Sequence, residues 1–156
     1  MTKDELNIRS AVPDDSDRLT DIALASKRYW KYPEDWITRW KSALTITENY
    51  LNDHQVVVGE VDQRVIGFYA LTEANGSWDL DHFWIHPDFM SRGFGRTLFH
   101  HLISYIASLG HNATLEIESD PHAEAFYLRM GAVRVGSTTT NWNGLMRTLP
   151  VLRYST

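Results

Sequence analysis

The sequence predicts a single α/β domain of the α+β kind, with a mixed, mostly antiparallel sheet of about seven strands flanked by about four helices. Two patterns indicate this class. Runs rich in β-branched and aromatic residues alternate with runs of helical apolar spacing, and three strand-like runs follow one another directly. The 156 residues are enough for one core and too few for two ordinary domains. We therefore expect residues 1–156 to form one domain.

The N-terminal third predicts one strand and two helices. Residues 6–11 alternate apolar and polar side chains, which is typical of a strand. Pro13 suits the first turn of a helix because its φ is fixed, and the aspartates after it favour the positive end of the helix dipole. Pro33 begins a second helix in the same way, with Trp36 and Trp40 about one turn apart.

The remaining chain predicts a meander followed by alternating helices and strands. Residues 54–61, 64–73 and 77–86 form the antiparallel meander, with tight turns at Asp62-Gln63 and Asn75-Gly76. An apolar stripe then predicts a helix that stops at Gly110. The later elements are a strand at 113–119, a helix at 121–130, and strands at 132–139 and 149–155.

Composition narrows the classes of function. The net charge of -5 shows no overall excess of basic residues that would bind a phosphate backbone, so we expect no nucleic-acid partner. The absence of cysteine excludes a disulfide scaffold and any thiolate ligand or nucleophile. No apolar run approaches the ~20 residues that span a bilayer, and the first residues do not resemble a targeting signal. We expect a cytoplasmic protein without membrane attachment.

The seven histidines do not predict a metal site. His82 and His86 are four residues apart, but on a strand this spacing separates them by about 13 Å. His100 and His101 are neighbours on a predicted helix and face different directions. The His-Glu-x-x-His pattern of zinc enzymes does not occur in the sequence.

A glycine-rich turn at Gly93 and Gly95 joins a predicted strand to a predicted helix. It is not a Walker A loop, and Leu98 stands where a dinucleotide fingerprint needs its third glycine. Glycines let backbone amides approach an anion at a helix N-terminus, and Arg92 and Arg96 can screen its charge. Taken alone, the pattern fits an anion-binding site, and it fits equally a sharp strand-to-helix turn with no ligand.

Two segments together are more specific than the turn alone. Residues 84–98 resemble the loop of the Gcn5-related N-acetyltransferase (GNAT) family, which has Arg or Gln, two residues, Gly, one residue, and Gly or Ala. Gly93 and Gly95 fit the two small positions, whereas Met90 departs from the first. Residues 119–132 resemble the family's downstream motif in their spacing, through Asp120 in place of Asn, Ala123, Phe126, Tyr127 and Gly131.

The resemblance covers the order of predicted elements along almost the whole chain, and it implies the GNAT acyl-CoA N-acyltransferase fold. It also implies acetyl-CoA as cosubstrate, with its pyrophosphate held by the backbone amides of the glycine loop. A backbone amide of the fourth strand is expected to bind the acetyl carbonyl oxygen, after a bulge that splays this strand from the fifth. The implied cofactor residues are Trp84, Ile85, Ser91, Arg92, Gly93, Phe94, Gly95, Arg96, Asp120 and Tyr127.

Acetyl transfer to an amine requires a base, because an alkylamine with a pKa near ~10.4 is protonated at neutral pH. The resemblance implies a base on the strand at 77–86, usually a glutamate. Asp81 is the first candidate here and Asp79 the second, although both also fit structural acids. Strict alternation places them on one face with Phe83 and Ile85, and places Trp78, Leu80, His82 and Trp84 on the other. His82 fits a packed histidine better than a base.

The departing thiolate of CoA leaves more easily when a donor protonates its sulfur. A tyrosine hydroxyl, with a pKa near ~10, keeps its proton at neutral pH. Tyr127 stands where family members often carry this acid. The alternative is a packed aromatic residue beside Phe126.

The acceptor is expected to be a primary amine of a small molecule or peptide. Trp30, Tyr32 and Glu34 are candidate acceptor residues between the first two helices, and Trp142 is another, near Arg147 in a predicted hairpin. The aromatic residues fit core positions equally well. A homodimer is compatible with the exposed strand edges, and nothing specifies one. The alternative function is a non-catalytic acyl-CoA-binding or regulatory module, which Met90, Asp120 and the missing strand glutamate favour.

Overall fold

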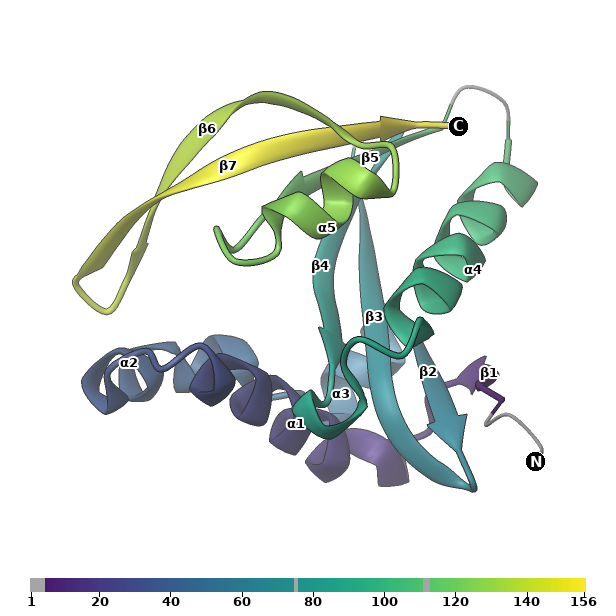
Figure 1. Cartoon of the computed structure of the whole chain (residues 1–156), viewed down its shortest axis with the longest axis horizontal. Coiled ribbons are helices and arrows are strands. Elements are labelled where there is room, and N and C mark those ends of the chain that lie inside the picture. The colour runs from purple at the N-terminus through teal and green to yellow at the C-terminus, as the bar shows by residue number, and fades with distance from the viewer. Residues whose placement is uncertain (1–4, 75, 111–112) are drawn as a thin grey trace.

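The computed structural model describes residues 5–74, 76–110 and 113–156. Its seven strands form one sheet in the order β1-β2-β3-β4-β5-β7-β6, in which only the β4–β5 pair is parallel. This mixed sheet confirms the predicted fold class (Figure 1). The strands are β1 (Asn7–Ser10), β2 (Gln55–Val61), β3 (Arg64–Ala74), β4 (Ser77–Ile85), β5 (Thr114–Glu118), β6 (Val133–Trp142) and β7 (Leu145–Ser155).

Helices cover both faces of the sheet. On one face, α1 (Ser16–Tyr29), α2 (Glu34–Leu44) and α3 (Glu48–Asp53) follow one another, and a 3₁₀ turn at Pro13–Asp15 leads into α1. On the other face lie α4 (Phe94–Ser108) and α5 (Glu124–Arg129). Alternation along β2 supplies both cores, because Val57 packs with the α4 cluster while Val56 and Val58 pack with the α1 cluster. In the described part of the chain, no helix has the length and apolar character needed to cross a membrane.

Four helices were predicted, and α3 is the additional helix that the sequence did not predict. It has six residues and buries none of them, so it carries no apolar stripe that a periodicity argument could detect. The Thr47 hydroxyl caps it by accepting a hydrogen bond from the backbone N–H of Tyr50, at 3.0 Å. This short helix matters for function because it brings Tyr50 to β4.

A β-bulge in β4 overturns the predicted division of its faces. Ala70 pairs with His82 and the next residue of β3, Leu71, pairs with Leu80, so Asp81 is the extra residue between them. The bulge shifts the alternation by one residue. Asp79 and Asp81 therefore share a face with His82 and Trp84, whereas Phe83 and Ile85 pack against the α4 cluster with Trp78 and Leu80.

The β6–β7 hairpin is longer than predicted, and it extends from the sheet to α2 (Figure 1). The β6 arm lacks the burial alternation of a core strand, because most of its residues are exposed. Asn143 and Gly144 form the predicted turn with φ of 51° and 88°. The Asn143 carbonyl accepts a hydrogen bond from the Arg39 guanidinium at 2.8 Å, which ties the hairpin tip to α2.

Two other predicted turns have different outcomes. Asp62 and Gln63 form the β2–β3 turn with positive φ values of 51° and 65°, as predicted. Asn75 lies outside the described residues, and its partner Gly76 has a φ of 80°.

Candidate active site

The site forms where β4 and β5 separate. These strands pair only at Trp78 with Leu115 and at Asp79 with Glu116, and beyond this point they diverge. The backbone N–H of His86 donates to β3, so the N–H of Ile85 points away from β3 and toward the gap. The carbonyl of Ile85 already accepts a hydrogen bond from Ser26 Oγ at 3.0 Å. Among the described residues the N–H of Ile85 has no hydrogen-bond acceptor, and the bulge at Asp81 lies earlier on the same strand.

The glycine loop presents a row of free amides beside this gap. Gly93 adopts the left-handed conformation with φ of 85° directly before α4, and Ser91 is also left-handed with φ of 61°. The first backbone bond of α4 runs from Thr97 N–H to the Gly93 carbonyl at 3.1 Å. Among the described residues, no acceptor occupies the backbone N–H groups of residues 91–96. Such a row at a helix N-terminus binds phosphate groups.

The space around the loop fits a bound pyrophosphate. A Cβ built on Gly93 would meet no described atom within 4 Å, so the space beside this residue is open. A Cβ on Gly95 would lie 3.4 Å from the Phe126 ring, which explains a small residue there. Arg92 and Arg96 are exposed beside the loop, and the Phe94 side chain is buried in the core. Nothing in the structure explains methionine at position 90.

Tyr127 lies in α5 with its ring packed against the rings of Phe83, Phe99 and Phe126, at centroid distances of 6.1, 6.1 and 5.3 Å. Its hydroxyl has no hydrogen-bond partner among the described residues. Burial raises the pKa of Tyr127, and the nearby Asp120 carboxylate raises it further. The hydroxyl is therefore protonated at neutral pH and is free to donate.

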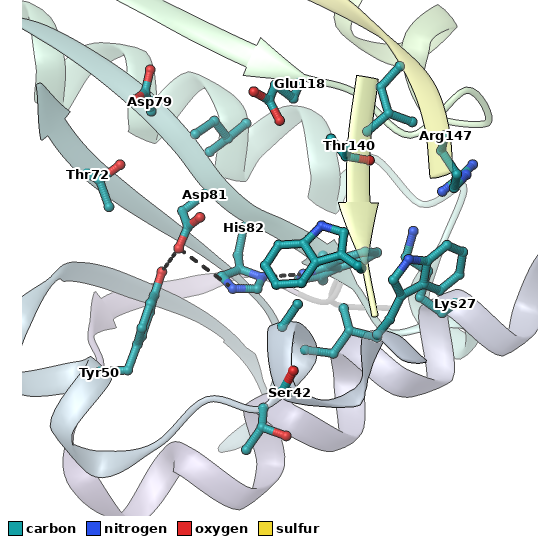
Figure 2. A pocket seen from close by; sticks show the side chains of 18 of the residues that line it. Lys27, Ser42, Tyr50, Thr72, Asp79, Asp81, His82, Glu118, Thr140 and Arg147 are labelled. Atoms are coloured by element: carbon teal, nitrogen blue, oxygen red, sulfur yellow. Dashed lines mark hydrogen bonds and ion pairs between the residues drawn. The ribbon is translucent and has the colours of Figure 1, made fainter. Parts of the chain in front are cut away.

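A cavity of about 600 Å³ opens on the helical face of the gap that carries α1–α3. Figure 2 shows Asp79 and Asp81 on one side of it and Arg147 with Lys27 on the other. Trp40, Trp84 and Trp142 also line the cavity, together with Ser42, Ala43, Leu44, Thr45, Tyr50, Thr72, Leu80, His82, Glu116, Glu118, Thr140 and Leu149.

Asp81 is held from two sides. The Tyr50 hydroxyl donates a hydrogen bond to its carboxylate, and Nε2 of His82 lies 3.8 Å from the same oxygen (Figure 2). The Trp84 indole N–H, which can only donate, contacts Nδ1 of His82 at 3.0 Å. Neutral His82 therefore carries its proton on Nε2, facing Asp81.

This arrangement separates the roles of the titratable groups on β4. Burial lowers the pKa of His82, and its Nδ1 is already occupied by the Trp84 indole N–H, so we assign His82 to the packing around Asp81 and not to the base. Burial also raises the pKa of Asp79, with Glu116 and Asp81 adding to the effect. Asp79 and Asp81 both reach the cavity as exposed carboxylates.

The opposite side of the cavity is a charged cluster built on Asp120. Lys27 Nζ lies 2.7 Å from its carboxylate, the Tyr32 hydroxyl donates to it at 2.9 Å, and the nearest Arg147 nitrogen is 3.9 Å away. Burial pushes the pKa of Asp120 upward, but Lys27 and the hydrogen bonds outweigh burial and hold that pKa below its usual value. Burial lowers the pKa of Lys27 despite this pairing. The side chain of Asp120, which is among the predicted cofactor residues, is engaged in this cluster.

The four candidate acceptor residues are found in different places. Trp142 lines the cavity. Tyr32 belongs to the Asp120 cluster, Trp30 stacks on His122 with ring centroids 4.6 Å apart, and Glu34 forms an exposed ion pair with Arg28 at 3.2 Å. The structure thus brings Trp142 and Tyr32 to the site but not Trp30 or Glu34.

Sequence reasoning missed Tyr50 and Lys27. Tyr50 had no signal, because α3 has no apolar stripe. Lys27 had one, since it continues the stripe of buried α1 residues that includes Leu19, Ala23 and Ser26. A lysine within such a stripe is almost never fully buried without a partner.

Comparison with known proteins identifies the family. The family model described as acetyltransferase (GNAT) domain matches residues 31–148. The chain belongs to the GNAT acetyltransferase family. This GNAT domain is similar in fold to the GCN5-related N-acetyltransferase titled "Aminotransferase, Class-II" from Rhodopseudomonas palustris, with a TM-score of 0.84 and 21% identity over 100% of this chain and 99% of that one.

Other relatives agree with this assignment. The PaiA N-acetyltransferase of Thermoplasma acidophilum, solved in complex with coenzyme A, matches the GNAT domain with a TM-score of 0.76 and 16% identity, over 97% of this chain and 99% of that one. The uncharacterized N-acetyltransferase ycf52 of Porphyra purpurea is 31% identical over 75 residues, which are 46% of this chain and 41% of that protein. The GNAT domain thus matches less than half the length of this curated relative. Within the described ranges, no group of three or more His, Cys, Asp or Glu residues could hold a metal ion.

Proposed function

We propose that this GNAT domain transfers an acetyl group from acetyl-CoA to the primary amine of a small molecule or peptide, by direct attack within a ternary complex. One observation carries the proposal. The free amides of the glycine loop and the acidic side of the cavity both adjoin the gap between β4 and β5. A cofactor held by the loop and an amine held in the cavity can therefore meet at the gap.

The residues of the loop fit the phosphates of acetyl-CoA. The backbone N–H groups of residues 91–96 would hold the pyrophosphate, and the exposed Arg92 and Arg96 would screen its charge. Bound acetyl-CoA supplies an activated acetyl thioester at the gap. The free N–H of Ile85 is oriented to stabilise negative charge that develops on a carbonyl oxygen there.

Asp81 is the group we assign to take the proton from the amine. Its carboxylate is fixed by Tyr50 and faces the cavity beside the bulge. Asp79 stands on the same face without a described ion-pair partner and is placed to attract an ammonium group. The nitrogen–carbon bond forms as the carbon–sulfur bond breaks, and the amine proton passes to Asp81.

Tyr127 is the group we assign to protonate the sulfur of CoA. Its side chain is buried, and its hydroxyl is protonated and has no described hydrogen-bond partner, so it has a proton to donate. Packing against three rings holds the side chain in place. CoA then leaves as a thiol, and the tyrosine proton is restored from water.

Initial-velocity kinetics test the proposal. Release of CoA thiol is measured over a panel of amines while both acetyl-CoA and amine concentrations are varied. A ternary complex predicts intersecting double-reciprocal lines, with release dependent on the amine. Parallel lines would contradict direct attack. Binding of acetyl-CoA by calorimetry without turnover of any amine would instead indicate a non-catalytic module.

A further inference from the structure

Arg147 lies at the cavity with most of its hydrogen-bonding capacity unused. It donates to the Tyr32 hydroxyl at 3.0 Å, and its nearest approach to Asp120, 3.9 Å, is too long for a hydrogen bond. In the described part of the chain, its other N–H groups have no hydrogen-bonded acceptor. The side chain is only 14% exposed and lines the cavity. Its free N–H groups open into the cavity, where a ligand can supply the acceptors that the described residues do not.

The charges of the Asp120 cluster do not balance. Lys27 and Arg147 bring two cations to one carboxylate. The oxygens of Asp120 are already engaged by Lys27, by the Tyr32 hydroxyl and by the backbone N–H of His122. An excess of positive charge therefore remains at a largely desolvated wall, where an incoming anion is strongly favoured.

Aromatic rings hold the Arg147 guanidinium in a fixed orientation. Its central carbon lies 5.0 Å from the ring centroids of both Tyr32 and Trp40, and 5.9 Å from that of Trp36. Contact with ring faces leaves the edge of the planar guanidinium free for hydrogen bonds. A fixed planar fork matches the two oxygens of a carboxylate.

The other side of the cavity has the opposite charge. Asp79 and Asp81 line it, and Glu118 faces it as a further exposed carboxylate (Figure 2). A ligand with only amino groups would satisfy these acids and leave the donors of Arg147 unpaired. A ligand with an amine and an anionic group satisfies both sides.

We propose that the acceptor is a small zwitterionic amine that carries a carboxylate, which Arg147 binds while Asp79 and Asp81 face its amino group. This inference rests on the proposed acetyl transfer and names its substrate class. Arg147 is therefore a specificity-determining residue.

The test compares amino acids with the amines that their decarboxylation gives. L-lysine is paired with cadaverine, L-phenylalanine with phenethylamine, and other L-amino acids likewise, with CoA release as the readout. We expect kcat/KM for the best amino acid to exceed that of its decarboxylated partner by about tenfold or more, the effect of a hydrogen-bonded charge pair. Equal or faster turnover of the decarboxylated amines would overturn the inference and leave acetyl transfer intact. Absence of turnover for every amine would refute the proposed function itself.

Substitution of Arg147 provides an independent readout. Arg147→Gln should raise KM for the preferred amino acid by about tenfold while changing kcat/KM for the decarboxylated amine less than about threefold. Arg147→Lys, which keeps the charge and loses the fork, should restore part of the preference. Arg134→Gln on β6 is the control, because Arg134 pairs with Glu124 and does not line the cavity. If Arg147→Gln lowers kcat/KM equally for an amino acid and for its decarboxylated partner, the assignment is contradicted. Acetyl-CoA affinity, measured in parallel, reports whether each variant is folded.

Discussion

Replacement of Gly93 by alanine should weaken acetyl-CoA binding, whereas a glycine replacement of similar cost elsewhere in the protein should not. Gly93 has a φ of 85°, and a Cβ at this position would meet no described atom within 4 Å. The substitution therefore introduces no clash with the protein. What it introduces is the cost of a left-handed conformation, about 1–2 kcal/mol for a residue with a Cβ.

This strain sets the size of the expected effect. If the alanine variant relaxes out of the left-handed conformation, the N–H groups of the loop no longer point toward one site. Binding of the phosphates must then return residue 93 to the strained conformation. The affinity then falls by the strain energy of about 1–2 kcal/mol, or roughly 5–30-fold in Kd.

The protein supplies a matched control at Gly76, in the turn between β3 and β4. Gly76 has a φ of 80° and likewise no described atom within 4 Å of a Cβ. Gly76→Ala should therefore lose a similar amount of stability in urea denaturation while keeping its acetyl-CoA affinity. Calorimetric titration of both variants measures the affinity directly. Equal Kd values for Gly93→Ala and Gly76→Ala would refute the phosphate-binding role of the loop.

The other predictions concern the remaining parts of the site. Tyr127→Phe should lower kcat about tenfold or more with acetyl-CoA affinity nearly unchanged, and a wild-type kcat would remove the acid role. Asp81→Asn should lower kcat by about 10²-fold or more, and Asp79→Asn should chiefly raise KM; the reverse pattern in steady-state kinetics would exchange their roles. Asp120→Asn should cost about 3–5 kcal/mol of unfolding free energy at neutral pH, because it leaves two cations without their carboxylate. Since Lys27 holds the pKa of Asp120 below its usual value, the wild-type protein keeps this stability above about pH 4 and loses it as the pH falls further. Urea denaturation against pH should show the difference from the variant shrinking in acid, and a constant difference would contradict the ion pair.

Local patterns predicted most of the fold. Turn residues, helix-starting prolines and apolar spacing are short-range signals, and they placed the meander, α1, α2, α4 and α5 in the right order. These signals missed the elements in which buried residues do not recur at a regular spacing. Most of β6 is exposed, and the six-residue helix α3 contains no fully buried residue, so neither has a pattern for periodicity to detect.

The sequence predicted the geometry of the glycine loop, but not the side chains that line the cavity. Gly93 and the helix after it form a contiguous motif, whereas Lys27 and Arg147 meet Asp120 across 93 and 27 residues of chain. The bulge at Asp81 shifts the later residues of β4 to the opposite face of the sheet from the one that strict alternation predicts. Long-range pairing therefore decides which charges face the cavity.

The most direct test of the account follows the acetyl group itself. The protein is incubated with acetyl-CoA that carries an isotope label in the acetyl group and with the preferred amine, and the products are separated and analysed by mass spectrometry. The account predicts that the label appears on the amine nitrogen in an amount equal to the CoA thiol released. Label recovered as free acetate, at a rate that does not depend on the amine, would contradict it.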